Sequence, residues 1–164
     1  MAQINQFYQT VGFHFSVEFS GLGQTDNSID ARFQSVTGLD VQFETETIKE
    51  GGENRFEHTV PSRRKYSNLT LKRGLLSPGS ASEITKWCKR GFDNVIMDLL
   101  ADSPIQPIDM VVNLLNEKHD VLMMWEIHHA WPVNWKMGEL NAERGEVLIE
   151  TIELHYNYFT FKSP

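Results

Sequence analysis

Apolar and polar residues alternate along most of this chain, as they do in strands that bury one face. The first run places Phe13, Phe15, Val17 and Phe19 on one side and polar residues on the other. Comparable runs predict strands over residues 33–36, 39–49, 55–60, 68–73, 108–115 and 121–129, and again near the end of the chain. We therefore expect a mainly β fold, either an antiparallel β barrel or a two-layer sandwich.

Two details qualify the C-terminal strands. Ile149 and Ile152 fall out of strict alternation, which predicts a bulge in the strand that contains them. Trp131, Pro132 and Trp135 follow the predicted 121–129 strand, and we expect them to support the core.

One stretch follows a helical period. Pro78-Gly79 interrupts the strands, and Ser80 with Glu83 three residues later has the spacing of a capping box. Apolar residues then recur at helical spacing at Ile84, Trp87, Cys88, Gly91, Val95 and Leu99. We expect one helix packed on the sheet or barrel, within an insertion at about residues 75–107 of a single domain spanning residues 1–164.

The segment over residues 39–60 is predicted to be a long protruding hairpin. Leu39, Val41 and Phe43 alternate with polar residues, but residues 45–47 are Thr, Glu and Thr, so the strand pair outruns its apolar face. An isolated hairpin is marginal in water and exposes unpaired edges. We therefore expect this hairpin to pair with a neighbouring subunit.

This hypothesis supplies the candidate interface residues. The two glycines at 51 and 52 permit the positive φ angles of a tight reversal, and Pro61 is expected to end the returning strand. Basic residues after the hairpin are expected to pair with acidic neighbours. The candidate subunit or ring contacts are Glu46, Glu50, Gly51, Gly52, Glu53, Asn54, Arg55, Lys72 and Arg73.

Charge is unevenly distributed along the chain, whose formal net charge is -7. Residues 49–90 hold ten of the fifteen Lys and Arg but only four of the 22 acids. The two parts form either two solvated faces of a monomer or complementary surfaces that dock head to tail, and such docking closes rings or extends filaments. The short basic run Arg63-Arg64-Lys65 is a solvated turn by default, and no specific nucleic-acid binding is expected.

The residue pattern offers little for catalysis. The single Cys88 lies among the apolar helix positions, which predicts a buried thiol. His128 and His129 near Glu126 are consecutive strand residues that diverge, and no zinc-ligand spacing accompanies them. Glu44 and Glu46 share a strand face that keeps them solvated. We expect no catalytic residue, metal or cofactor.

No stretch approaches the ~20 apolar residues that span a bilayer. The first residues lack both a basic region and an apolar run, so no signal peptide and no membrane insertion segment are expected. We expect the chain to be made and folded in the cytosol.

Several short motifs resemble one family in their order and spacing. They are Glu50-Gly51-Gly52 with Asn54, Pro61, Lys65-Tyr66-Ser67-Asn68-Leu69, Lys72-Arg73-Gly74, Ala130-Trp131-Pro132-Val133 and Glu150-Thr151-Ile152-Glu153-Leu154. Together they are similar to the tail-tube family of contractile phages and phage-tail-like injection systems. The chain departs from simple members between Gly74 and Ile108, where it is longer and more helical.

The resemblance implies a structural subunit. Six copies would form a ring, and stacked rings would form the rigid inner tube that a contracting sheath drives through a target envelope. The implied partners are further copies of the chain, the sheath protein, baseplate or spike and tail terminator components, and cargo in the lumen. The particle would be a phage tail or an injection system.

Two alternatives stay open. A tube-initiating, baseplate-proximal paralogue would use residues 75–107 to contact a spike or hub and would stop at one ring. A monomeric sugar- or peptide-binding β domain would instead use surface tryptophans as a stacking platform.

Overall fold

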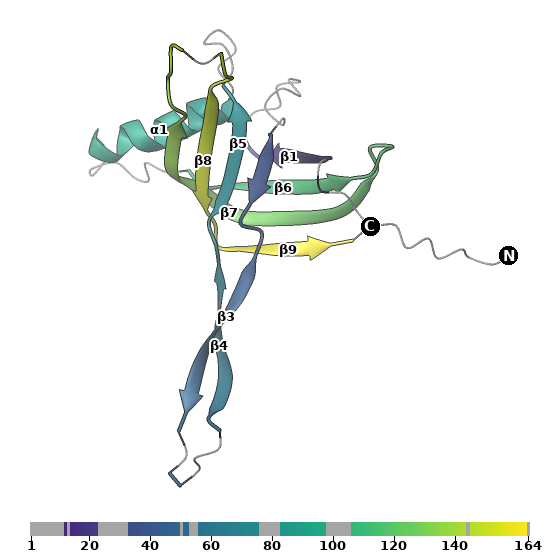
Figure 1. Ribbon diagram of the computed structural model, residues 1–164, viewed down its shortest axis with the longest axis vertical. Helices are drawn as coiled ribbons and strands as arrows, with labels where there is room; N and C mark the ends of the chain where they lie inside the picture. Colours follow the sequence, from purple (N-terminus) through teal and green to yellow (C-terminus); the bar gives the residue numbers. More distant parts are fainter. Residues whose placement is uncertain are drawn as a thin grey trace, which may run out of the picture.

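The computed structural model describes residues 12, 14–22, 33–49, 51–52, 56–75, 83–97, 106–143 and 145–163. The predicted mainly β fold with one helix is confirmed (Figure 1). The elements are β1 (Phe15–Phe19), β2 (Ser35–Thr37), β3 (Val41–Ile48), β4 (His58–Tyr66), β5 (Leu69–Gly74), α1 (Glu83–Met97), β6 (Ile108–Leu115), β7 (Val121–Met137), β8 (Ile149–His155) and β9 (Tyr158–Lys162).

Strand β7 belongs to both layers of an antiparallel sandwich. Its first part pairs with β6 and β9, and its last part pairs with β8. β1 extends the first layer beside β6, while β5 and β2 extend the second beside β8. Figure 1 shows β6 and β9 running across the direction of β5 and β8. The corner lies at His129, where φ is 63° and the register with β6 slips, as is usual where a strand passes between sheets.

The core lies between these layers and α1. Val17, Leu71, Ile127 and Ile152 are fully buried strand residues. The predicted apolar stripe of the helix is confirmed at four positions, because Ile84, Trp87, Cys88 and Gly91 are all buried. Ser80 and Leu99 lie outside the described residues.

Gly91 lets the helix approach the sheet closely. A Cβ added there would lie 3.2 Å from Cγ of Pro132 on β7. Pro132 is buried and Trp135 packs against the core, so the expectation that these residues support the core is confirmed for both. Trp131 is half-buried, and its ring contacts His155. β7 continues to Met137, well beyond the predicted end at residue 129.

The entry to the hairpin is fixed by Gly38 and Tyr156. Gly38 has φ 96°, and a Cβ there would lie 2.0 Å from the carbonyl oxygen of Asn68, so no larger residue fits. The Tyr156 hydroxyl donates to the Gly38 carbonyl oxygen at 2.9 Å. Burial raises the pKa of Tyr156 to about 12, so this donor keeps its proton at neutral pH.

Pro61 does not end the returning hairpin strand, which was the prediction; β4 runs through it to Tyr66. The register shifts beside this proline, since Phe43 pairs with Arg64 while Thr45 pairs with Pro61. Proline removes a backbone donor but is accommodated at bulges and edge strands, and both strands of a two-stranded hairpin are edges.

The bulge predicted in the strand of Ile149 and Ile152 is also absent, because the β5–β8 register runs unbroken from Leu69–Leu154 to Gly74–Ile149. Glu150, rather than Ile149, takes the inward position and is completely buried. The irregularity lies on β7, between Pro132 and Asn134.

Candidate assembly interface

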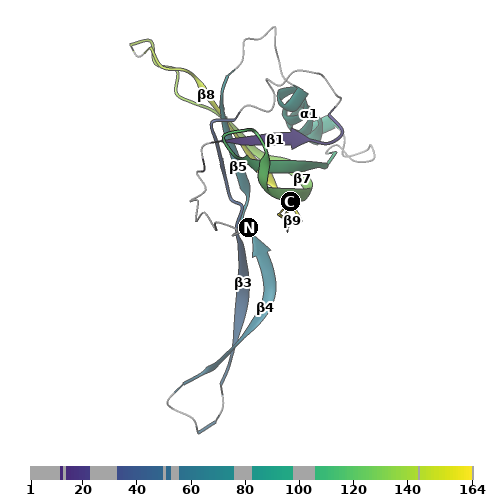
Figure 2. The same ribbon diagram turned by 90° about the vertical axis from the view of Figure 1, so that its right-hand side faces the viewer.

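The β3–β4 hairpin extends away from the body of the protein (Figures 1 and 2). Its strands pair from Val41–Tyr66 at the base to Ile48–His58. Every side chain of β3 is exposed, and so is every side chain of β4 before Tyr66. Strand pairing therefore continues well past the region where the body could bury either strand.

Large apolar side chains lie exposed along this hairpin. We predicted an apolar face formed by Leu39, Val41 and Phe43; Leu39 packs against the core, but Phe43 is 56% exposed and Val41 is similarly open. Ile48, Phe56 and Val60 are exposed as well. Several exposed apolar side chains on one element are typical of a surface that contacts another chain.

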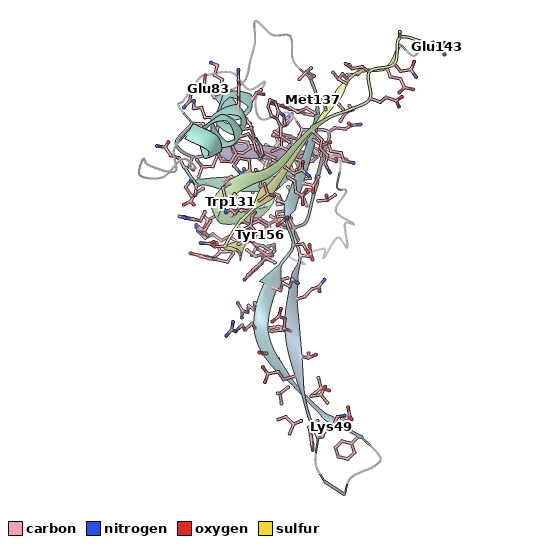
Figure 3. The ribbon with its side chains drawn as sticks, turned by 90° about the vertical axis from the view of Figure 1, so that its left-hand side faces the viewer. Lys49, Glu83, Trp131, Met137, Glu143 and Tyr156 are labelled. Carbon is pink, nitrogen blue, oxygen red and sulfur yellow. The ribbon has the colours of Figure 1, made fainter. Side chains whose placement is uncertain are left out.

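Polar contacts across the hairpin keep its strands in register but contribute little stability. The Ser62 hydroxyl donates to the Glu46 carboxylate at 3.1 Å, and the Arg64 guanidinium lies 5.7 Å from the centre of the Phe43 ring. Lys49, near the far end of the hairpin in Figure 3, is 3.9 Å from the Glu57 carboxylate. Exposed pairs of this kind are typically worth at most about 1 kcal/mol.

The candidate residues at the hairpin end are only partly described. Gly51 and Gly52 form a turn, and Gly52 has φ 102°. The connection between the paired Ile48 and His58 spans residues 49–57, which is longer than the tight reversal predicted. The candidates outside the described residues are Glu50, Glu53, Asn54 and Arg55.

Lys72 and Arg73 are adjacent on β5 but occupy opposite environments. Lys72 is exposed beside β2, where it pairs with Ser35. Arg73 is only 3% exposed, and its Nε donates to the Glu150 carboxylate at 2.5 Å. The Arg73 charge is therefore paired inside the protomer, and we leave Arg73 out of the proposed interface.

A polar cluster around Arg73 joins four elements. Its Nη2 donates to the Thr85 hydroxyl of α1 at 2.5 Å, and its guanidinium lies 5.8 Å from the centre of the Phe33 ring. The Trp135 indole N–H on β7 donates to Glu150 at 2.7 Å. Sequence reasoning missed Glu150; the available signal was its position two residues before Ile152 and four before Leu154, on their face of β8.

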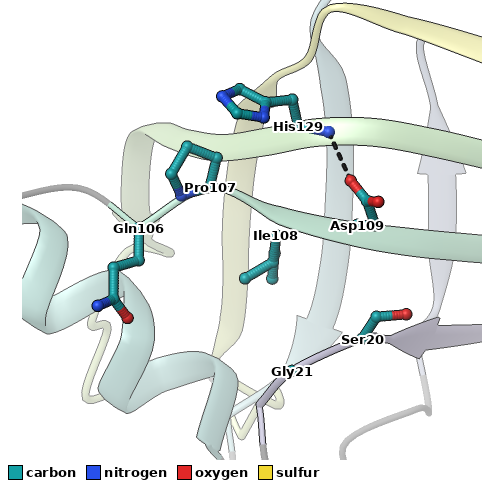
Figure 4. Close-up of a pocket in the computed structure, with 7 residues that line it drawn as sticks. All are labelled: Ser20, Gly21, Gln106, Pro107, Ile108, Asp109 and His129. Carbon is teal, nitrogen blue, oxygen red and sulfur yellow. Dashed lines mark hydrogen bonds between the residues drawn. The ribbon is translucent and has the colours of Figure 1, made fainter.

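Another cluster lines an open surface hollow of about 750 Å³ between Gly21, Gln106 and the β6–β7 pair (Figure 4). The backbone N–H of His129 donates to the Asp109 carboxylate at 2.9 Å, and this bond is the main reason that the pKa of Asp109 is lowered. His128 lies 3.6 Å from the same carboxylate. Asp109 thus supports the corner of β7.

The described residues hold no group of three or more His, Cys, Asp and Glu able to bind a metal ion. Burial raises the pKa of Cys88 to about 12, which keeps this thiol protonated and unreactive. No helix in the described part of the chain is both long and apolar enough to cross a membrane.

A β sandwich that extends an exposed, partly apolar hairpin defines a class of protein, the structural subunit of an assembly. The family of the T4-like virus tail tube protein gp19 matches residues 11–160, and the chain belongs to this family. It is a tail-tube-like structural protein of phage tails and contractile injection systems and not an enzyme. No curated protein sequence matches the chain.

Solved structures share the fold over nearly the whole chain. A chain in the 6-fold symmetrised baseplate of the anti-feeding prophage (AFP) is 28% identical, with TM-score 0.77 over 95% of this chain and 97% of that one. A chain of the AFP tube terminating cap is 24% identical, with TM-score 0.74 over 99% and 97%. A chain of the sheath-tube complex of the extracellular contractile injection system PVC is 19% identical, with TM-score 0.74 over 97% and 95%.

Proposed function

We propose that this protein forms hexameric rings that stack into the hollow inner tube of a contractile tail or injection machine. The observation that carries the proposal is the β3–β4 hairpin, which pairs beyond the body and leaves Phe43 and Ile48 exposed. Membership of the tail-tube family and the 6-fold symmetry named for the AFP baseplate support the ring.

The physical argument is that the hairpin requires a second surface. Two-stranded hairpins are marginal alone, and exposed strand edges favour pairing with another chain. A contact between two different surfaces of identical subunits either closes a ring or extends indefinitely. In the proposed tube the hairpin segment contacts adjacent copies within or between rings, and Lys72 on β5 adds a further contact. The proposed contacting residues of the hairpin segment are Glu46, Glu50, Gly51, Gly52, Glu53, Asn54 and Arg55.

The proposal includes partners outside the ring. A contractile sheath would surround the tube, baseplate or spike and terminator components would hold its ends, and DNA or effector cargo would pass through the lumen. Assembly would take place in the bacterial cytoplasm before the tube enters a phage tail or an injection particle. Components named for sheath-tube, baseplate and cap complexes share the fold of this chain.

A single-ring initiator is the second candidate. It is favoured by the likeness to a chain from the AFP baseplate, which is 28% identical, against 19% for the PVC sheath-tube chain. The ligand-binding monomer has little support, because Trp87 is buried and the other three tryptophans are half-buried, which leaves no open stacking platform.

Negative-stain electron microscopy of the purified protein across a concentration series, with light scattering on the same samples, tests these roles. We expect stacked rings or tubes at high concentration. Rings that never stack would assign the initiator role. Monomers that form no ring, even when co-expressed with the other components of the same particle, would contradict both.

A further inference from the structure

A second projection lies at the opposite end of the protein from the hairpin. Residues 138–148 connect β7 to β8, and we call them the β7–β8 projection. In Figure 3 its Glu143 and the hairpin residue Lys49 lie at opposite extremes of the molecule, and Figure 1 shows the same opposition along the longest axis.

The base of the projection is well held. The Gly138 N–H donates to the Ile149 carbonyl at 2.8 Å, and the Leu75 N–H donates to the Leu148 carbonyl at 2.8 Å. Further out, the Glu143 N–H is capped by the Asn141 side-chain oxygen at 2.9 Å. The projection is therefore presented by β7, β8 and the end of β5 in a defined orientation.

Two apolar side chains of the projection are more exposed than any on the hairpin. Leu140 is 82% exposed and Val147 is 73% exposed, and Met137 lies open at the base. Leu140 and Val147 border one small hollow of about 220 Å³ between the two limbs. Two such residues lining one hollow form an apolar surface that a partner would cover.

The charges of the projection complement those at the base of the hairpin. The projection contains Glu139, Glu143 and Glu146 against the single Arg144. The base of the hairpin exposes three consecutive basic residues, Arg63-Arg64-Lys65, next to Val41 and Phe43. The acids near this base are Asp40, which precedes β3 and accepts a hydrogen bond from Ser67, and Glu44 on β3.

We propose that the β7–β8 projection of one copy docks against the base of the hairpin of a second copy in the next ring. The projection lies at one end of the long axis, and the base of the hairpin lies where β3 and β4 meet the body, nearer the middle. Displacement of a second copy along that axis therefore brings its projection to the base of the first copy's hairpin, and one of each surface stays free at the ends of a stack. Each such contact pairs the glutamates of the projection with the basic residues of the hairpin base. It also covers Leu140 and Val147 with Val41 and Phe43. The inference rests on the proposed stacking of rings and names the surfaces that stack.

A charge exchange tests the contact. The projection variant carries Glu143→Lys and Glu146→Lys, and the hairpin variant carries Arg63→Glu and Arg64→Glu. Either variant alone places like charges together, and we expect the fraction of stacked rings to fall about tenfold or more while single rings persist. Combining all four substitutions restores opposite charges and should restore stacking. The matched control is Glu117→Lys, an exposed carboxylate on the β6–β7 turn.

A crosslink provides a second measurement that does not depend on charge. In the variant that carries both Leu140→Cys and Phe43→Cys, oxidation of assembled tubes should link copies in successive rings through disulfides. Either cysteine alone should give no such linked multimers. The native Cys88 is buried and does not interfere.

The outcomes separate this contact from the proposed function. Wild-type tubes together with unaffected charge variants and no crosslink would overturn the contact and leave the tube intact. Rings whose stacking is lost in both charge variants and not restored by the exchange would also overturn it. A wild-type chain that forms no rings under any condition would overturn the proposed function and the contact with it.

Discussion

At the scale of single residues, the buried ion pair of Arg73 and Glu150 is the most consequential feature. Both side chains are almost completely buried. The Trp135 indole N–H donates a hydrogen bond to Glu150, and the Thr85 hydroxyl accepts one from Arg73. A buried pair stabilises only weakly compared with apolar residues of the same shape, but loss of one partner leaves an uncompensated charge. The pair fixes which face of β5 and β8 points inward.

We expect Glu150→Ala to lower the free energy of unfolding by about 3 to 5 kcal/mol, because Arg73 would remain buried without its carboxylate. Urea unfolding of the monomer, followed by circular dichroism, measures this loss. The double variant Arg73→Met with Glu150→Leu removes both charges and should recover most of the stability. A double variant as unstable as Glu150→Ala would contradict this account of the pair.

The pair also shows where sequence reasoning stops. The alternation of Phe15, Val17 and Phe19 with polar residues predicted β1. Alternate residues of a strand point to opposite faces, so only one orientation buries the apolar face. Glu150 breaks that rule, since its charge is neutralised by an arginine 77 residues away, and no local pattern encodes that partner. Treating Ile149 as inward therefore produced a bulge that does not exist.

At the scale of elements, the sequence predicted the protruding hairpin but not where its returning strand ends. Polar residues after Phe43 showed that it would protrude, because the body could not bury them. The same pattern could not show that Val41 and Phe43 are also exposed, since an apolar face looks identical whether the protomer or a neighbour covers it. Likewise, a proline interrupts a strand only where strand pairing requires a backbone N–H at that position. The register shift beside Pro61 removes this requirement.

Gly52→Val should impair assembly while leaving the circular dichroism spectrum of the protomer nearly unchanged. Gly52 has φ 102°, which a β-branched residue adopts only with strain, and the turn lies far from the core. Gly12→Val is the control, because Gly12 has no positive φ, no atom within 4 Å of an added Cβ and no place among the proposed contacts. Electron microscopy and light scattering compare the two variants. Normal rings and tubes from Gly52→Val would argue against a role for this turn in assembly.

At the scale of the whole molecule, α1 and the two sheets enclose one core. Cys88 reports on that enclosure, because the thiol is fully buried between the helix and the strands. Burial raises its pKa to about 12, so the reactive thiolate is scarce at neutral pH in the folded protein and becomes available on unfolding, where the pKa returns toward about 8.5.

We therefore expect a thiol-specific reagent to modify the folded protein at neutral pH very slowly and the urea-unfolded protein at once. Modification as a function of urea concentration should follow the unfolding curve measured by circular dichroism. Rapid labelling without urea would show that α1 separates from the sheets while the rest of the fold persists. The Cys88→Ala variant provides the background rate.

The continuity of β7 has a mechanical consequence. One covalent strand passes from the first layer to the second, so the layers cannot slide past each other without breaking its hydrogen bonds to β6, β8 and β9 together. A load applied at one end of the protomer is therefore shared by many bonds strained in parallel. In a tube driven forward under axial force, the protomers would behave as rigid blocks, and any bending or compression would be confined to the joints between them.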